Sequence, residues 1–402
     1  MKKKSSIGIL TVAAFCLFFI NTSAQILTSQ DSANAGIISN GKTTEISAYG
    51  EAKVQYDFRF NTAIANLTRN VVYGEHQFNN MISLFAGVEV DNAKSFAVQQ
   101  CFLKCNINSN NYLVAGLFTP RIGIINENSI PTTFNGNDRP FVEALIIPST
   151  WREIGIGFYG SCKSTPFYYS IGIVNGLNAQ GFSMQNGIGG NGLYEGTNAS
   201  ATNIALTGSL LYYIGHLRIQ ASGYYGGSVG LNKQQADSLQ LDYGPFGSPV
   251  ALGEFDVQYL TKAFTFKALG TMVSIPEADT INRAYDNNVP QQMIGAYAEL
   301  GVNLAYLINN NTARNFTVFA RYEYVNMDAK TSAEGISDPT RQLKYIIAGI
   351  TYMPIKGVAF KADYVFRQSG PPNPLLLAEF AQPGQYYTAN GYLNIGIAYS
   401  IN

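Results

Sequence analysis

The chain has 402 residues with 26 basic and 26 acidic side chains, so its formal net charge is zero at pH 7. Charged residues make up 13% of the chain and aromatic residues another 13%, whereas a soluble chain usually carries about 25% charge. The lack of a clustered basic surface excludes a nucleic-acid-binding protein. Only one long apolar run is present, which excludes a bundle of membrane-spanning helices and leaves a membrane β-barrel open.

The first 24 residues have the pattern of a secretory signal peptide. Three lysines at positions 2–4 precede an apolar run over 7–20, which is too short to cross a bilayer comfortably. We expect cleavage after Ala24, then a periplasmic lead-in over 25–42 and one β-barrel over 43–402. The signal carries three of the basic residues and none of the acidic ones, so the mature chain has a net charge of −3.

From residue 46 to residue 60, apolar and polar side chains alternate, as in a strand with one apolar and one wet face. The stretch is longer than the roughly five to six residues of a typical soluble strand. The same period recurs up to residue 401, and tyrosine or phenylalanine often ends the apolar face. Almost no charge falls on the apolar faces. The candidates for lining a lumen are Lys53, Arg59, Arg218, Lys267, Glu299, Arg321, Glu323, Lys361 and Arg367.

Short connections and long ones follow each other in regular order. The short turns are expected near 106–111, 163–166, 215–216, 261–263, 309–315 and 354–357. The long loops are expected near 119–150, 175–200, 228–249, 275–290, 327–341 and 368–385. In outer-membrane barrels the short turns face the periplasm, the long loops face outside and the strand number is even, so about 15 visible strands imply one more, which we place within 61–78. The sequence therefore predicts an all-β fold, a transmembrane antiparallel β-barrel of about 16 strands.

A barrel of that size is too wide for its own side chains to fill and leaves an aqueous channel. No plug domain is visible before residue 43. We therefore expect an outer-membrane pore for passive diffusion of small hydrophilic solutes, with a filter made by inward side chains and an inserted loop. The partners are then the lipid bilayer and the solutes, with no nucleic acid and no cofactor or metal. The inward Tyr159, Tyr213 and Tyr224 suit either sugar stacking or a plain amphipathic wall.

One region is more specific than the rest. Gly116-Leu-Phe-Thr-Pro-Arg-Ile-Gly123 ends a strand and opens the longest loop, which closes with Arg139-Pro-Phe-Val-Glu143 and Ile147-Pro-Ser-Thr-Trp-Arg-Glu-Ile-Gly155. This region resembles the phosphate-selective porin O and P family, in which a strand ending in Gly-x-Phe-x-Pro leads into a loop that folds into the barrel. The resemblance implies a 16-stranded, homotrimeric, substrate-selective porin.

The resemblance also implies a pore constriction lined by Arg121, Arg139 and Arg152, with Glu143 and Glu153 beside them. Alternatively, Arg139 and Arg152 pair with Asp138, Glu143 and Glu153 and pin the loop against the wall. Basic rings give anion selectivity and acidic rings favour cations. The family has a basic lumen, whereas the inward faces here carry similar numbers of both signs. Phosphate, other anions, sugars and mixed small solutes all stay open.

Other functional classes have weaker support. Gly226-Gly-Ser-Val-Gly230 fits the spacing of a nucleophile elbow, but that motif needs a strand-to-helix turn and a histidine partner. The chain has only His76 and His216, so we expect no enzyme. The remaining alternative is a barrel whose surface loops bind a partner, as in an adhesin or an assembly component. It differs from a porin in placing the 119–150 loop outside the barrel.

Three cysteines remain in the mature chain, at positions 101, 105 and 162. An odd number of cysteines does not make a disulfide framework in an oxidising compartment. Cys101 and Cys105 lie on one face of a predicted strand, about 13 Å apart, which is too far for a disulfide. We expect all three to be small lipid-facing residues.

Overall fold

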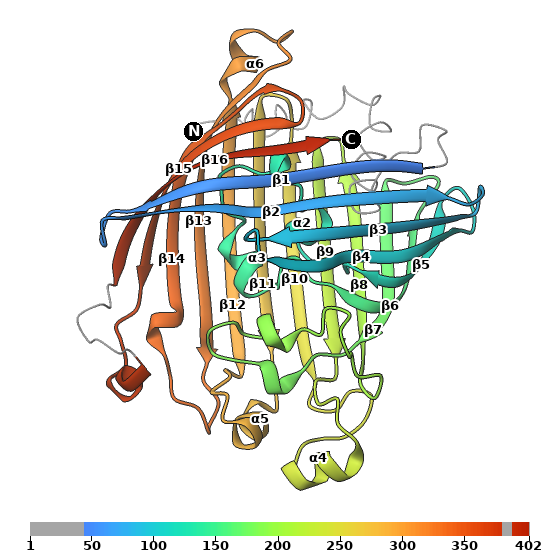
Figure 1. Cartoon of the computed structure of the whole chain (residues 1–402), viewed down its shortest axis with the longest axis vertical. Coiled ribbons are helices and arrows are strands. Elements are labelled where there is room, and N and C mark those ends of the chain that lie inside the picture. Colours follow the sequence, from blue (N-terminus) through green and yellow to red (C-terminus); the bar gives the residue numbers. More distant parts are fainter. Residues whose placement is uncertain (1–43, 380–387, 402) are drawn as a thin grey trace, which may run out of the picture.

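The computed structural model describes residues 44–379 and 388–401. The predicted signal peptide, the lead-in and part of the last long loop lie outside these residues. The described chain forms a closed barrel of sixteen antiparallel strands, which confirms the predicted fold class and strand number (Figure 1). No helix in the described ranges is long and apolar enough to cross a membrane.

The strands are β1 (Thr44–Asp57), β2 (Thr62–Gln77), β3 (Ile82–Asp91), β4 (Ser95–Asn106), β5 (Asn111–Phe118), β6 (Glu153–Ser161), β7 (Phe167–Asn175), β8 (Ile204–Ile214), β9 (Leu217–Gly226), β10 (Val250–Leu260), β11 (Phe264–Ser274), β12 (Gln292–Asn303), β13 (Asn315–Lys330), β14 (Gln342–Ile355), β15 (Val358–Ser369) and β16 (Ala389–Ile401). The short helices are α2 (Ile124–Glu127), η1 (Pro131–Thr133), α3 (Phe141–Leu145), η2 (Ala179–Gly181), η3 (Gly190–Gly192), α4 (Lys233–Leu239), α5 (Ala278–Tyr285), α6 (Leu304–Ile308), η4 (Pro339–Arg341) and η5 (Pro374–Glu379).

Each strand pairs with its neighbours in the chain, and β1 pairs with β16 from Ala48↔Ile401 to Asp57↔Tyr392. Closure leaves no free sheet edge along this seam, as a bilayer requires. The weak strand predicted within 61–78 is β2. Its register against β1 shifts at a bulge, where Glu51 faces Arg69 but Lys53 faces Asn66. The extra residue reverses the alternation of β2, which explains why its sequence pattern is poor.

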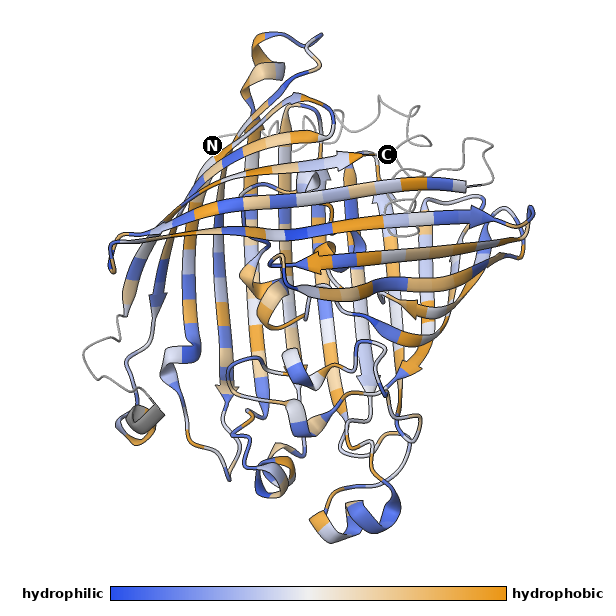
Figure 2. Cartoon of the chain, in the orientation of Figure 1, coloured by the Kyte–Doolittle hydropathy of each residue, from blue (hydrophilic) through white to orange (hydrophobic). Residues whose placement is uncertain are grey.

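The two faces of the wall differ as the alternation predicts. The outward Ile46 is 72% exposed, whereas the inward Asp256 and Glu323 are fully buried. Figure 2 shows apolar and polar residues alternating along the strands. The short turns and the long loops also lie at opposite ends of the barrel, with α6 at the short-turn end and α4 and α5 at the long-loop end (Figure 1).

Two details of the wall differ from the prediction. Arg59 is exposed in the turn after β1 and does not line the lumen, because the Asp57 carboxylate accepts hydrogen bonds from the backbone N–H groups of Arg59 (2.8 Å) and Phe60 (3.0 Å) and ends the strand. The turn expected near 309–315 begins earlier, at α6. There the Asn303 side chain accepts a hydrogen bond from the backbone N–H of Tyr306.

The long connection between β5 and β6, residues 119–152, lies inside the barrel. Figure 1 shows its helices α2 and α3 behind β1–β3, enclosed by the wall. Loop residues with no exposed surface, including Ile122, Ile147 and Trp151, join inward residues such as Phe102 and Leu269 in one apolar cluster. The lumen is therefore partly filled by apolar packing, and it is not the uniformly wet channel that barrel width alone suggests.

Candidate functional site

Glu143, at the start of α3, joins the two ends of the inserted loop. Its carboxylate accepts hydrogen bonds from the Ile125 backbone N–H (2.6 Å) and from the Tyr297 hydroxyl on β12 (2.7 Å). Gly123 opens α2 with a φ of +79°, and a Cβ there would lie 2.9 Å from a Glu143 carboxylate oxygen. The carboxyl is fully buried, and this burial raises its pKa to about 7 although both hydrogen bonds favour the charged form. Glu143 thus holds the two ends of the loop together and binds them to the barrel wall.

Lys361 on β15 anchors the middle of the loop. Its ammonium donates hydrogen bonds to the carbonyl oxygens of Pro131 (2.6 Å), Phe134 (2.9 Å) and Gly136 (2.8 Å). It also lies 4.2 Å from the centroid of the Phe134 ring. The three N–H donors of the buried Lys361 ammonium are therefore all used by carbonyl oxygens of the loop, and residues 131–136 curve around the ammonium.

Ion pairs continue this attachment around the wall. Lys53 on β1 pairs with Asp138 of the loop. Arg321 on β13 pairs with Glu299 (3.1 Å) and Glu323 (2.8 Å) and donates to the Asp138 carbonyl oxygen (3.1 Å). Most of the inward positive charge near the middle of the loop is therefore compensated by carboxylates.

The first turn of the loop is held on the opposite wall. Arg218 on β9 pairs with Glu127 of α2 and with Asp256 on β10 (3.3 Å). Lys267 on β11 donates to the Thr133 carbonyl oxygen (3.3 Å). Arg367 on β15 is half-buried. All of the residues predicted to line the lumen, except Arg59, thus lie on strands of the wall.

The arginines and glutamates expected at the constriction do not form one cluster. Arg121 pairs with Glu127 (3.7 Å) and lies over the Tyr159 ring, with 5.3 Å between guanidinium carbon and ring centroid. Glu153 accepts a hydrogen bond from the Trp151 indole N–H (2.7 Å). These two residues stand at the beginning and the end of the loop.

Arg139 and Arg152 lie on the long-loop side of the inserted loop. Arg152 pairs with Glu89 (3.7 Å) and Glu195 (2.8 Å), and Arg139 donates to the Ser149 carbonyl oxygen (2.8 Å). The pairing of Arg139 and Arg152 with Asp138, Glu143 and Glu153 is absent from the described residues, because Lys53, Tyr297 and Trp151 occupy those carboxylates.

The inward tyrosines do not form a continuous track. Tyr159 stacks on Tyr112 with 5.1 Å between centroids, Tyr213 contacts the edge of Tyr168, and Tyr224 packs on Trp151 at 4.8 Å. Each tyrosine thus belongs to a separate aromatic pair. Of the cysteines, Cys101 and Cys162 are exposed and Cys105 is half-buried.

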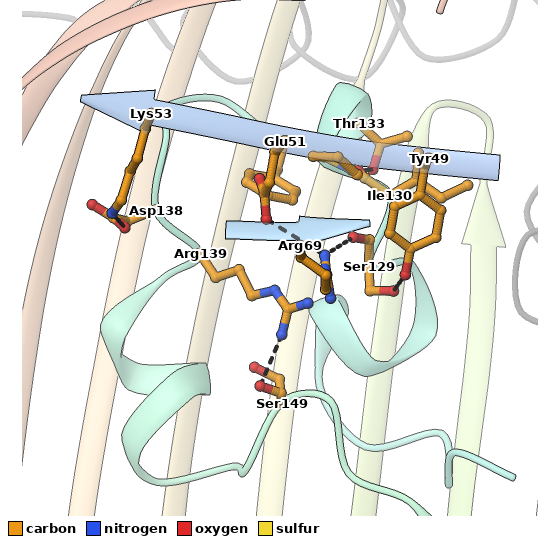
Figure 3. A network of polar contacts seen from close by, with 12 residues as sticks. Tyr49, Glu51, Lys53, Arg69, Ser129, Ile130, Thr133, Asp138, Arg139 and Ser149 are labelled. Atoms are coloured by element: carbon orange, nitrogen blue, oxygen red, sulfur yellow. Dashed lines mark hydrogen bonds and ion pairs between the residues drawn. The ribbon is translucent and has the colours of Figure 1, made fainter. Parts of the chain in front are cut away.

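Near β1, a second set of hydrogen bonds and ion pairs holds the loop against the wall, as Figure 3 shows. The Tyr49 hydroxyl lies 3.0 Å from the Ser129 hydroxyl, and Arg69 on β2 donates to the Ser129 carbonyl oxygen (2.7 Å). Arg69 also lies 3.7 Å from Glu51. Sequence reasoning did not single out Arg69, because the bulge in β2 hides its inward direction.

The loop separates two cavities. The first, of about 420 Å³ and here named cavity 1, lies on the long-loop side, between β1–β3 and the two loops 119–152 and 176–203. The second, of about 490 Å³ and named cavity 2, lies toward the short turns and is lined by Lys267, Thr317 and Lys356 among others. Charged side chains line both cavities, beside a substantial apolar surface. The arrangement suits a barrier that water-soluble molecules reach from either side.

Solved structures with a similar fold are outer-membrane porins. The anion-selective porin from Comamonas acidovorans matches with a TM-score of 0.55 at 10% identity, over 89% of this chain and 99% of that one. Salmonella typhi OmpF, in complex with daunomycin, matches with a TM-score of 0.53 at 12% identity, over 91% and 99%. The trimer form of in-vitro folded OmpT, an outer membrane protein of Vibrio cholerae, matches with a TM-score of 0.50 at 10% identity, over 89% and 99%.

Among curated sequences, an uncharacterized protein of Aquifex aeolicus (strain VF5) is 26% identical over 338 residues, which cover 81% of this chain and 76% of that protein. No protein-family profile matches the chain. The comparisons therefore establish the fold, which is that of an outer-membrane porin. The resemblance to the phosphate-selective family continues to rest on residues 116–155.

Proposed function

We propose that this protein is an outer-membrane porin through which small hydrophilic solutes diffuse passively. The observation that carries the proposal is the position of residues 119–152 inside a closed barrel, with a cavity that charged side chains help to line on each face of the loop. Strand alternation supports a position in the outer membrane, and the apolar start of the chain supports export through a cleaved signal peptide. No cofactor takes part in such a process.

The charges around the loop favour a weakly ion-selective pore over a dedicated phosphate channel. Anion channels carry rings of arginine or lysine whose charge is open to the ion. Lys53, Arg218 and Arg321 are instead each paired with carboxylates. Phosphate passage therefore has less support than passage of mixed small solutes, and the separated tyrosine pairs give little support to a sugar track.

We further propose that the protein assembles as a homotrimer, by analogy with the trimer form of OmpT. The alternative of a barrel whose loops bind a protein partner has less support. It needs the longest loop on the outside, whereas residues 119–152 contact β1, β9, β12, β13 and β15 from within.

The test is electrical. The mature protein is refolded in detergent, its folding is verified by heat-modifiable migration, and it is inserted into a planar bilayer with a salt gradient. We expect discrete ohmic current steps and a reversal potential close to zero, with little block by phosphate. A folded sample that never conducts would refute the porin proposal. A strongly anion-selective current blocked by phosphate would instead support the dedicated channel.

A further inference from the structure

Cavity 1 contains two opposite charges that the protein itself does not compensate. Eight charged side chains line it, and six of them form ion pairs: Glu51 with Arg69, Glu89 and Glu195 with Arg152, and Asp138 with Lys53, which lies outside the lining. Asp91 and Arg139 are the remaining two. Neither has an oppositely charged side chain within 4.0 Å among residues 44–379 and 388–401.

The positive side of the cavity has spare hydrogen-bond donors. Arg139 uses one N–H for the Ser149 carbonyl, and Figure 3 shows its side chain extending from the loop toward Arg69 and Ser149. Arg69 is only 3% exposed, yet its Nε and Nη1 groups have no hydrogen-bond acceptor in the described structure. A buried guanidinium with unmet donors is costly, and a carboxylate is the acceptor that fits a guanidinium best.

The carboxylate of cavity 1 that has no ion-pair partner, Asp91, lies next to these arginines. Asp91 is the last residue of β3 and faces Arg69 directly in the antiparallel register. Side chains at such opposite positions start about 4.5–5.5 Å apart. Arg69 nevertheless turns away from Asp91, toward Glu51 and Ser129. The Asp91 carboxylate is left half-buried at the rim of the cavity, beside the short turn 92–94.

We propose that cavity 1 is a binding site for small zwitterions, solutes that carry one carboxylate and one ammonium group, such as amino acids and short peptides. The carboxylate of the solute binds the Arg139 guanidinium, with the positive charge of Arg69 beside it, and its ammonium binds Asp91. The volume of about 420 Å³ lies within the roughly 300–1,000 Å³ of small-molecule sites. The inference names the solute class of the proposed pore and so rests on the proposed function.

The test compares three small solutes: glycylglycine as the zwitterion, propionate as the anion and propionamide as the neutral molecule. Binding to the folded protein in detergent is measured by saturation-transfer NMR, and passage is measured by liposome swelling. We expect glycylglycine to bind about a hundredfold more tightly than propionamide, because each of its two charge-assisted contacts provides about a factor of ten.

The variants separate the two ends of the site. Arg139→Gln is expected to lower the binding affinity for glycylglycine and for propionate by about tenfold each. Asp91→Asn should lower the affinity for glycylglycine only, and propionate should bind as well as to the wild type or better. The charge exchange Asp91→Arg with Arg139→Asp restores part of the zwitterion affinity. Lys262→Gln and Glu334→Gln, at exposed positions in other connections, serve as charge-matched controls and leave binding unchanged.

The outcomes also separate this inference from the porin proposal. Equal binding of glycylglycine and propionamide in a conducting protein overturns the zwitterion site and leaves the porin intact. Parallel losses for propionate and glycylglycine in Asp91→Asn also overturn it. Selective binding of glycylglycine by a folded protein that does not conduct supports the site and refutes the porin.

Discussion

The strongest prediction concerns Lys361, because one side chain holds a whole segment of the inserted loop. Replacing it by methionine keeps most of the side-chain volume but removes the ammonium. The carbonyl oxygens of Pro131, Phe134 and Gly136 then lose their donor. Leaving a buried hydrogen-bond acceptor without its donor typically costs about 1–3 kcal/mol, and three acceptors lose theirs here.

That energy concerns the docking of the loop more than the folding of the barrel, because the strand ladder of β15 does not use the lysine side chain. Since about 1.4 kcal/mol corresponds to a factor of ten, the ratio of undocked to docked loop should rise at least about a hundredfold. We expect larger or noisier single-channel current and faster hydrogen exchange of residues 131–138, with unchanged heat-modifiable migration.

The matched control is Lys262→Met, which alters an exposed lysine in the turn between β10 and β11. It should leave current, exchange and folding as in the wild type. If Lys361→Met shows wild-type current and wild-type exchange in a folded barrel, the idea that Lys361 holds the loop is refuted.

Three further predictions follow from the same geometry. Burial raises the pKa of Glu143 from 4.5 to about 7, so protonation of this carboxyl favours the docked loop. The extra docking stability is complete below about pH 4.5 and is lost as the pH rises to about 7, and the noise of the single-channel current should rise over the same range. Glu143→Gln should make this noise nearly independent of pH. Arg321→Met leaves Glu299 and Glu323 buried without their cation and should lower the free energy of unfolding in urea by about 3–5 kcal/mol. Arg59→Met, in an exposed turn, should change it by less than about 0.5 kcal/mol. Equal urea midpoints of unfolding for the two variants would contradict the role of Arg321 as the cation of these two glutamates. A membrane-impermeant maleimide should label Cys162 in its turn but not Cys101 on the outer face of β4 in liposomes, whereas both should react in denaturant; labelling of Cys101 in intact liposomes would mean that this face is not covered by lipid.

Much of the wall could be predicted because its signal is local. The direction of a side chain on a strand follows from its position in the chain, so Arg218, Glu299, Arg321, Glu323 and Lys361 could be assigned to the interior from alternation alone. The same rule failed in two places where local geometry intervened. The Asp57 carboxylate ends β1 before Arg59, and the bulge in β2 hides Arg69.

The candidate site was predictable only in outline. The pattern from Gly116 to Gly155 located the loop that enters the barrel. It did not show that Arg152 would find Glu195 on a different loop, or that Arg139 would stay without a carboxylate. Glu195 follows no motif in a glycine- and asparagine-rich segment, so its role carries no signal in the sequence.

The sequence by itself determined the strands, their two faces, the alternation of short turns and long loops, and the identity of the inserted loop. These properties depend on neighbouring residues and on the two-residue period of a strand. Only the tertiary structure decided which charges meet, as when Lys361 binds carbonyl groups more than 220 residues earlier in the chain. Closure of the barrel sets these distances, and with them which charges in cavity 1 are left for a solute.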